Sequence, residues 1–177
     1  LDLIQKEEAK GIPLMTTINA NSEILKYHTG MKFFYNESYA IAEHILVQAD
    51  RQFGGVDTGG SVATNAFSLL YKIGLTRIIL VGQDLAFTNN RSHADGTFQK
   101  EMKEENTEGF IMVEGNTEKE VPTTSSLKLY LDWYEKYIDK IHKEEEGFLI
   151  INATEGGAKI KGTEIMSLRD AIAQECT

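Results

Sequence analysis

Two short apolar segments, residues 77–81 (RIILV) and 148–151 (FLII), constrain the fold of this chain more than any other feature. After Arg77 no polar residue interrupts either segment, a pattern that is typical of strands buried on both faces of a parallel sheet. A helical spacing of apolar residues precedes each one: Ala63, Ala66, Phe67, Leu70 and Ile73 before the first, and Leu127, Tyr130, Leu131, Tyr134, Tyr137, Ile138 and Ile141 before the second. This alternation predicts an α/β fold with a doubly wound, largely parallel sheet.

The other segments are consistent with a single α/β domain over residues 1–177. The chain has 177 residues, of which 41% are hydrophobic and 25% charged, as expected for one globular domain. Strands at 12–18 and 31–35, a hairpin around Gly115-Asn116 and a last helix near 167–174 complete the predicted elements. The first residue is Leu1 rather than Met, in a helical-looking segment. We therefore expect a fragment of a longer protein.

Charge and cysteine content narrow the functional class. The chain carries 27 acidic and 18 basic residues, and its net charge of −9 argues against a non-specific nucleic-acid binder. Its only cysteine is Cys176, which fits a reducing compartment. Its apolar runs are far too short to span a bilayer. We expect a cytoplasmic protein with no membrane span and no nucleic-acid partner.

The ends of the two apolar segments locate a candidate site. The first is followed by Gly82-Gln83-Asp84, and the second by Asn152-Ala153-Thr154-Glu155-Gly156-Gly157. In doubly wound sheets, ligands bind beyond the carboxyl ends of the strands. We therefore expect the polar side chains of Gln83, Asn152 and Thr154 at a ligand site.

The turn Thr58-Gly59-Gly60-Ser61 opens the helix that precedes the first apolar segment. Glycines allow a ligand close to the backbone, and a helix N-terminus favours an anion such as a phosphate or a carboxylate. An ordinary tight turn with Ser61 as the helix cap explains the same residues equally well. The turn is neither a Walker A motif nor a GxGxxG fingerprint.

Three side chains are candidates for acid–base chemistry. Asp84 directly follows the first apolar segment, where a carboxylate can act as a base, bind a ribose or hold a metal, or else cap the next turn. Glu155 has a similar place after the second segment and is alternatively a simple turn residue. His93, in the long polar loop 89–109, can serve near neutral pH, although a solvated histidine is the commoner case.

Together these segments resemble the motility accessory factor (Maf) family, which shares a domain with MptE-like proteins, named after a pterin diphosphokinase. The resemblance rests on three separated segments in the family's order: TGGSVATNA through GQDLAFT (58–88), SHADG (92–96), and NATEGGA with KGT (152–163). One departure is a Gly-x-Gly-Pro-Ser-Leu type loop, normally near the start of the family domain, that does not occur before Gly11. We therefore expect either a truncated domain that lacks its N-terminal strand and loop, or a protein that has lost this element.

The resemblance implies a Rossmann-like domain related to bacterial sialyltransferases. Such a domain would transfer a nonulosonic acid from a CMP-sugar to a flagellin Ser or Thr hydroxyl without a metal cofactor. The turn from Thr58 to Ser61 would meet the nucleotide, and the reacting sugar would lie between Asp84, His93 and Glu155. The donor-binding set implied in this way is Thr58, Gly59, Gly60, Ser61, Asn65, Gln83, Asn152 and Thr154.

Two other functions fit the same residues. A 6-hydroxymethylpterin diphosphokinase would use ATP and Mg²⁺, with Asp84 and Glu155 available to the metal. A non-catalytic nucleotide- or partner-binding module is favoured by the missing N-terminal loop.

Overall fold

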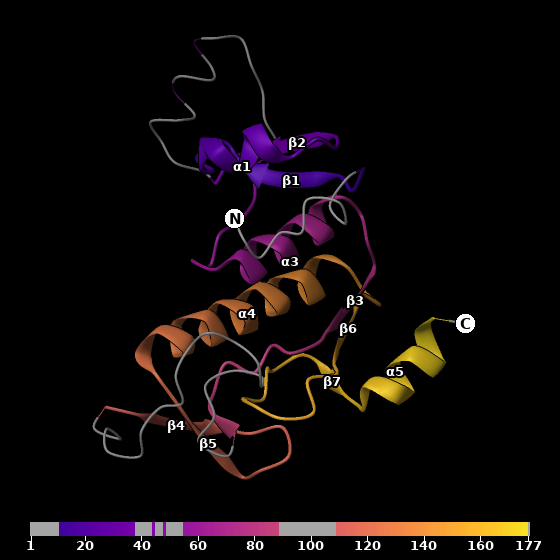
Figure 1. Ribbon diagram of the computed structural model, residues 1–177. Coiled ribbons are helices and arrows are strands. Elements are labelled where there is room, and N and C mark those ends of the chain that lie inside the picture. The colour runs from indigo at the N-terminus through magenta and orange to yellow at the C-terminus, as the bar shows by residue number, and fades with distance from the viewer. Residues whose placement is uncertain (1–10, 38–43, 45–47, 49–54, 89–108, 177) are drawn as a thin grey trace. The chain divides into compact units, whose positions relative to one another are not determined.

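The computed structural model describes residues 11–37, 44, 48, 55–88 and 109–176, and the chain divides into two compact units, Leu1–Thr58 and Gly59–Thr177 (Figure 1). Each unit contains its own parallel strands, so the predicted α/β class is confirmed. That both units belong to one domain stays a prediction. The segments 1–10 and 89–108, with His93, lie outside the described residues.

The first unit is a strand–helix–strand arrangement. Strands β1 (Leu14–Thr17) and β2 (Lys32–Tyr35) pair in parallel, and the short helix α1 (Ser22–Tyr27) lies between them in the chain. The Asn21 side chain caps this helix by accepting the Glu23 backbone N–H at 2.9 Å. These elements confirm the strands predicted at 12–18 and 31–35.

The second unit is built on the two predicted apolar strands. Strand β3 (Arg77–Leu80) pairs in parallel with β6 (Leu149–Asn152), and β6 pairs in parallel with the short strand β7 (Glu164–Ile165). The sheet order is β3-β6-β7. Both apolar segments therefore lie in one parallel sheet, as predicted.

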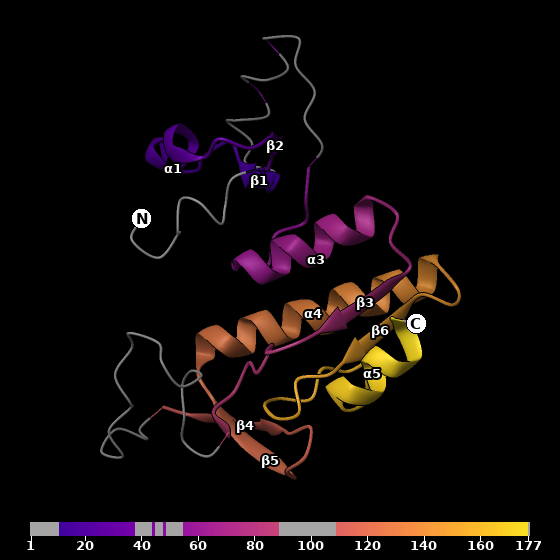
Figure 2. The ribbon, with the colours of Figure 1, turned by 45° about the vertical axis from the view of Figure 1, so that its right-hand side comes forward.

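Helices cover both faces of this sheet (Figure 2). Helices α3 (Val62–Lys72) and α4 (Ser125–Glu144) pack on one face, and α5 (Leu168–Glu175) packs on the other. Alternate strand residues supply the two cores. The α3/α4 side buries Ile78, Leu80 and Ile150 with Phe67, Tyr134 and Ile138, and the α5 side buries Ile151 and Ala153 with Ala171.

Strand boundaries differ from the predicted ones by one residue. β3 ends at Leu80, whose carbonyl accepts the Ala153 N–H at 2.9 Å, and Val81 is exposed before Gly82 turns the chain with φ +66°. Asn152 was expected after the second strand but is its last residue. It pairs with Leu80 on one side and with Ile165 of β7 on the other, and β7 was not predicted from its two exposed residues.

The hairpin β4 (Ile111–Glu114) and β5 (Glu120–Thr123) pairs antiparallel around Gly115-Asn116, as predicted. Thr124 alone separates β5 from α4, and its hydroxyl caps that helix by accepting the Leu127 N–H at 3.3 Å. Across the described residues, the helices are all too short or too polar to cross a membrane.

Candidate functional site

The start of α3 is a closed capping arrangement centred on Thr64. The Ser61 hydroxyl accepts the Thr64 backbone N–H at 3.2 Å, and the Thr64 hydroxyl accepts the N–H groups of Gly59 (3.1 Å) and Ser61 (3.2 Å). The Thr64 hydroxyl also donates to the Ser61 carbonyl at 2.7 Å and is fully buried. The prediction of Ser61 as the cap is confirmed. Thr64, which sequence reasoning missed, is signalled by its place three residues after the cap.

Packing against α4 explains the two glycines of this turn. A β-carbon on Gly59 would lie 2.6 Å from ring atoms of Trp133, so only glycine fits against that ring. Gly60 adopts φ +92°, a left-handed conformation that favours glycine. For a ligand, the turn offers the first-turn N–H groups of Val62 and Ala63, which a helix leaves without intrahelical acceptors.

The strand ends bring Gln83 and Thr154 together. The Gln83 backbone N–H donates to the Thr154 hydroxyl at 3.1 Å, and the Gln83 side-chain oxygen accepts the Tyr134 hydroxyl at 3.3 Å. Burial raises the pKa of the Tyr134 phenol well above its ordinary value, which keeps this donor protonated. Two of the residues predicted for the site are therefore adjacent.

The loops after β3 and β6 cross at Gly157. The Ala158 N–H donates to the Asp84 carbonyl at 2.7 Å, and the Gly157 N–H donates to the Thr88 hydroxyl at 2.7 Å. A β-carbon on Gly157 would lie 2.2 Å from the Asp84 carbonyl oxygen, and the residue has φ +69°. This crossing fixes the backbone of Asp84, whose residue is otherwise exposed.

Left-handed backbone follows both strands at residues other than glycine. Leu85 has φ +52° and Glu155 has φ +63°. The Leu85 carbonyl accepts the hydroxyl of the buried Thr123 at 2.7 Å, which helps to hold that conformation. A strained backbone conformation persists only where the surrounding contacts hold it in place. Residues in such conformations are often found at functional sites.

One of the two predicted carboxylates, that of Glu155, has a contact with the backbone of α5. A Glu155 side-chain oxygen accepts the Leu168 backbone N–H at 3.0 Å, so this carboxylate lies at the start of α5. Asn152 is fully buried, and its amide oxygen accepts the Thr154 N–H at 3.2 Å. Both side chains therefore shape the β6–α5 connection. Asn65 is buried on α3, and Thr58 belongs to the first unit.

Helix α4 links the two halves of the predicted site. Trp133 packs against Gly59, and the adjacent Tyr134 bonds Gln83. The N-terminus of α3 and the carboxyl ends of β3 and β6 lie at the same end of the second unit (Figure 2). Gly59 and Gln83 are thus both in contact with α4, although each is about 50 or more residues from its partner in the chain.

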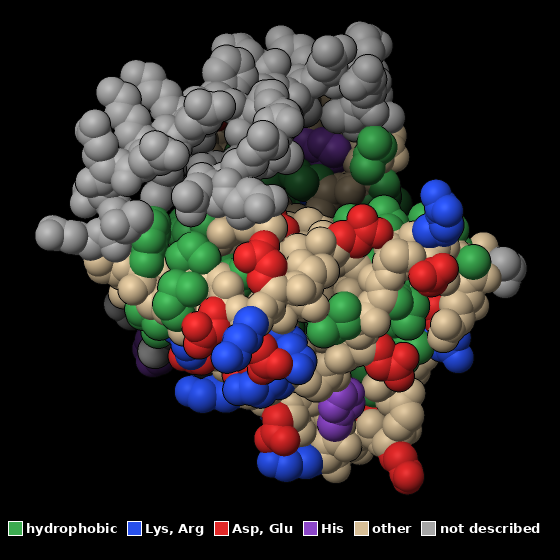
Figure 3. Space-filling model, turned by 90° about the horizontal axis from the view of Figure 1, so that it is seen from below, with side chains coloured by type: hydrophobic (Ala, Val, Ile, Leu, Met, Phe, Trp, Pro, Cys, Tyr) green, Lys and Arg blue, Asp and Glu red, His purple; other side chains and the backbone are tan. Residues whose placement is uncertain are grey.

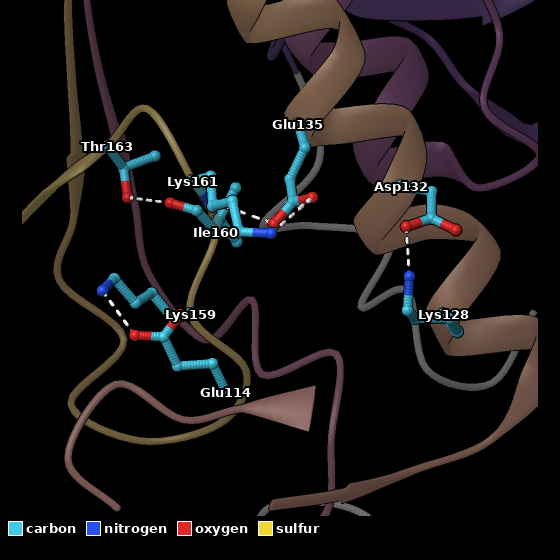
Figure 4. Close-up of polar contacts among 8 residues, drawn as sticks. All are labelled: Glu114, Lys128, Asp132, Glu135, Lys159, Ile160, Lys161 and Thr163. Carbon is cyan, nitrogen blue, oxygen red and sulfur yellow. Dashed lines mark hydrogen bonds and ion pairs between the residues drawn. The ribbon is translucent and has the colours of Figure 1, made fainter. Parts of the chain in front are cut away.

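Two lysines, Lys159 and Lys161, lie in the loop after β6, and a third, Lys128, lies on α4. Lys159 pairs with Glu114 at 2.6 Å, Lys161 pairs with Glu135 at 3.8 Å, and Lys128 pairs with Asp132 (Figure 4). On the face of the molecule shown in Figure 3, basic and acidic side chains lie side by side. Exposed pairs of this kind contribute little to stability.

Acidic, histidine and cysteine side chains of the described segments form no group of three or more that could hold a metal ion. A hollow of about 360 Å³ lies against the β4–β5 hairpin, lined by Glu114, Gly115, Glu118, Lys119 and Glu120. None of these five belongs to the predicted site.

The fold and the strand-end loops define an α/β protein with a parallel sheet and a candidate ligand site at the sheet's carboxyl edge. The chain belongs to the 6-hydroxymethylpterin diphosphokinase MptE-like family, whose family model matches residues 1–90. The match includes the Gly59–Ser61 turn, α3, β3 and Asp84. No significant match was found among curated proteins or among solved structures.

Proposed function

We propose that this chain is a sialyltransferase-like glycosyltransferase domain that binds a CMP-sugar. It would transfer a nonulosonic acid to a Ser or Thr hydroxyl of a protein such as flagellin. The observation that carries the proposal is the shared end of the second unit, where the α3 N-terminus and the crossed loops after β3 and β6 are held by one helix, α4. Membership of the MptE-like family supports a nucleotide-bearing substrate.

The first turn of α3 suits the phosphate of the donor. Its N–H groups and the positive end of the helix dipole stabilise negative charge. In the reaction, the acceptor hydroxyl oxygen attacks the anomeric carbon while the bond from that carbon to the CMP phosphate breaks. Charge then accumulates on the departing phosphate, which is the position that a helix N-terminus stabilises.

Asp84 is our candidate for the base that accepts the acceptor's proton. It lies on the carboxyl edge of the sheet, it is exposed, and its backbone is fixed by Ala158 and Gly157. Glu155 is the second candidate, and its carboxylate accepts the Leu168 N–H at the start of α5. His93 is the alternative base that the family resemblance implies.

A second candidate function is the transfer of diphosphate from ATP to a pterin. The description of the matched family favours it. That reaction requires Mg²⁺ to bridge the phosphates, and the lysines beside the β6 loop would supply positive charge. The two functions differ in nucleotide and in metal requirement.

Thermal unfolding with added nucleotides separates the candidates. A nucleotide at 100 times its Kd stabilises the folded state by about 2.7 kcal/mol, enough for a clear rise in Tm. The glycosyltransferase proposal expects this rise with CMP or CDP in the presence of EDTA, and a smaller one with ATP. A rise only with ATP and Mg²⁺ would support the diphosphokinase. Binding of CMP without transfer to any hydroxyl acceptor would indicate a binding module.

A further inference from the structure

Asn116 lies in the turn between β4 and β5, but its bonds lead out of the hairpin. Its side-chain N–H donates to the Gly156 carbonyl at 2.5 Å, and its side-chain oxygen accepts the Asn152 amide N–H at 3.2 Å. Its backbone N–H donates to the Gly157 carbonyl at 3.0 Å. A turn asparagine whose role is local would typically bond its own backbone instead.

The two amides form a directional chain. The Asn152 oxygen accepts the Thr154 N–H, so the Asn152 nitrogen faces the Asn116 oxygen. The Asn116 nitrogen must then face the Gly156 carbonyl. Because Asn152 is fully buried, losing a partner leaves a polar group without water to replace it. Each amide therefore fixes the orientation of the next.

This chain ends at the candidate site. Thr154, whose backbone is held by Asn152, presents its hydroxyl to the Gln83 N–H. Gly157, whose carbonyl accepts the Asn116 backbone N–H, packs against the backbone of Asp84. Main-chain bonds reinforce the same junction: the Lys159 N–H donates to the Glu114 carbonyl at 2.8 Å, and Gly115 forms a bridge with Ala158.

We propose that Asn116 is a positioning residue that holds the loop of residues 154–157 in the conformation required for ligand binding at the carboxyl edge of β3 and β6. The identity of the ligand rests on the proposed function, and we use CMP as its probe. The loop-holding role does not depend on that identity. Asn116 itself would act through Thr154, Gly156 and Gly157 and would not touch the ligand.

The test uses Asn116→Asp, because a carboxyl changes its hydrogen bonding with pH. When ionised it accepts from Asn152 but repels the Gly156 carbonyl; when protonated it regains one O–H donor. At pH 7 we expect faster amide exchange at Thr154, Gly157 and Ala158 and about tenfold weaker CMP binding. Both changes should reverse as pH falls towards the ordinary aspartate pKa of about 3.9.

Three comparisons make the result specific. The wild-type chain carries the neighbouring charges Glu114, Glu118, Glu155 and Lys159, so its own pH profile is subtracted. Asn116→Ala should lose the loop protection without recovering it at low pH. Thr117→Ala, at the exposed neighbouring position, should behave as wild type. Amides in the α4 core should keep their protection in every variant, which shows that the fold is intact.

The outcomes separate the two proposals. Faster exchange confined to the loop, with recovery at low pH in Asn116→Asp, supports the positioning role whether or not CMP binds. If CMP binds neither the wild-type chain nor any variant, only the proposed function is contradicted. Unchanged loop exchange in Asn116→Ala would overturn the positioning role. So would a loss of protection throughout α4, because Asn116 would then stabilise the fold as a whole.

Discussion

At the scale of single residues, the crossing of two loops over one glycine has the greatest consequence. Gly157 packs against the backbone of Asp84 and has a left-handed φ, so both its close packing and its conformation favour glycine. Gly74 also has left-handed φ, at +89°, but no atom lies within 4 Å of the position where its β-carbon would be. A comparison of substitutions at Gly157 and Gly74 therefore separates the cost of a strained backbone from the cost of a steric clash.

We expect Gly157→Ala to destabilise the fold much more than Gly74→Ala. Left-handed backbone alone costs about 1–2 kcal/mol at a residue with a β-carbon. The contact with Asp84 adds an overpacking cost of about 1–3 kcal/mol, because backbone must move. Urea unfolding of both variants measures the difference. Equal losses would show that the two loops do not cross as described.

Asp84→Asn tests the proposed base. The residue is exposed, so a nearly isosteric change should leave the free energy of unfolding within about 0.5 kcal/mol. Transfer from a CMP-sugar should fall by about 10²–10⁴-fold, as for a lost acid–base group. Asp139→Asn, at an exposed ion pair on α4, serves as the matched control. A destabilised but fully active Asp84 variant would remove this carboxylate from the reaction.

At the scale of elements, the sequence was sufficient to predict the helices and strands whose apolar residues follow a strong periodic pattern. The apolar segments before Gly82 and Asn152 and the helical spacing before each predicted the central strands and α3 and α4 correctly. The strand β7 could not be predicted, because its two exposed residues carry no pattern and gain order only by pairing with β6. The same limit applies to Asn116, whose partners are 36 and 40 residues away.

Local sequence was also insufficient to separate ligand binding from capping at the start of α3. The glycines of that turn permit a phosphate, but Gly59 is equally required by its packing against Trp133, which is more than 70 positions away in the chain. Likewise, the positions of Glu155 and Asp84 after their strands are similar in sequence. Only the tertiary structure shows that one carboxylate caps α5.

The contact between α3 and α4 provides a pH-dependent prediction. Burial, with hydrogen bonds and charge repulsion from Glu145 and Glu144, raises the pKa of Tyr71 from 10.0 to about 12. The folded state then holds this proton more tightly than the unfolded state. Its stabilising contribution is complete below pH 10 and is lost as pH rises from 10 towards 12.

Ultraviolet titration of the phenols measures this shift directly. We expect one tyrosine that ionises near pH 12 in the wild-type chain and is missing in Tyr71→Phe. The stability of that variant should also fall less steeply above pH 10. Ionisation of every tyrosine near pH 10 in the folded protein would contradict the described α3–α4 contact.

At the scale of the whole molecule, the second unit directs several elements to one edge of its sheet. The α3 N-terminus, the Gln83–Thr154 contact and the loop held by Asn116 all lie on the carboxyl side of β3 and β6. Parallel sheets place loops and helix N-termini at this edge together, which is why ligands bind there in doubly wound folds. We propose that this edge is the nucleotide site.

Residue-resolved amide exchange with and without saturating CMP tests that claim most directly. We predict slower exchange at Val62 and Ala63 in the first turn of α3 and at Gln83 and Thr154 after the strands, with unchanged exchange at Met112 on the outer hairpin. Protection confined to the hairpin or to α5, with none at the α3 first turn or the strand ends, would contradict it.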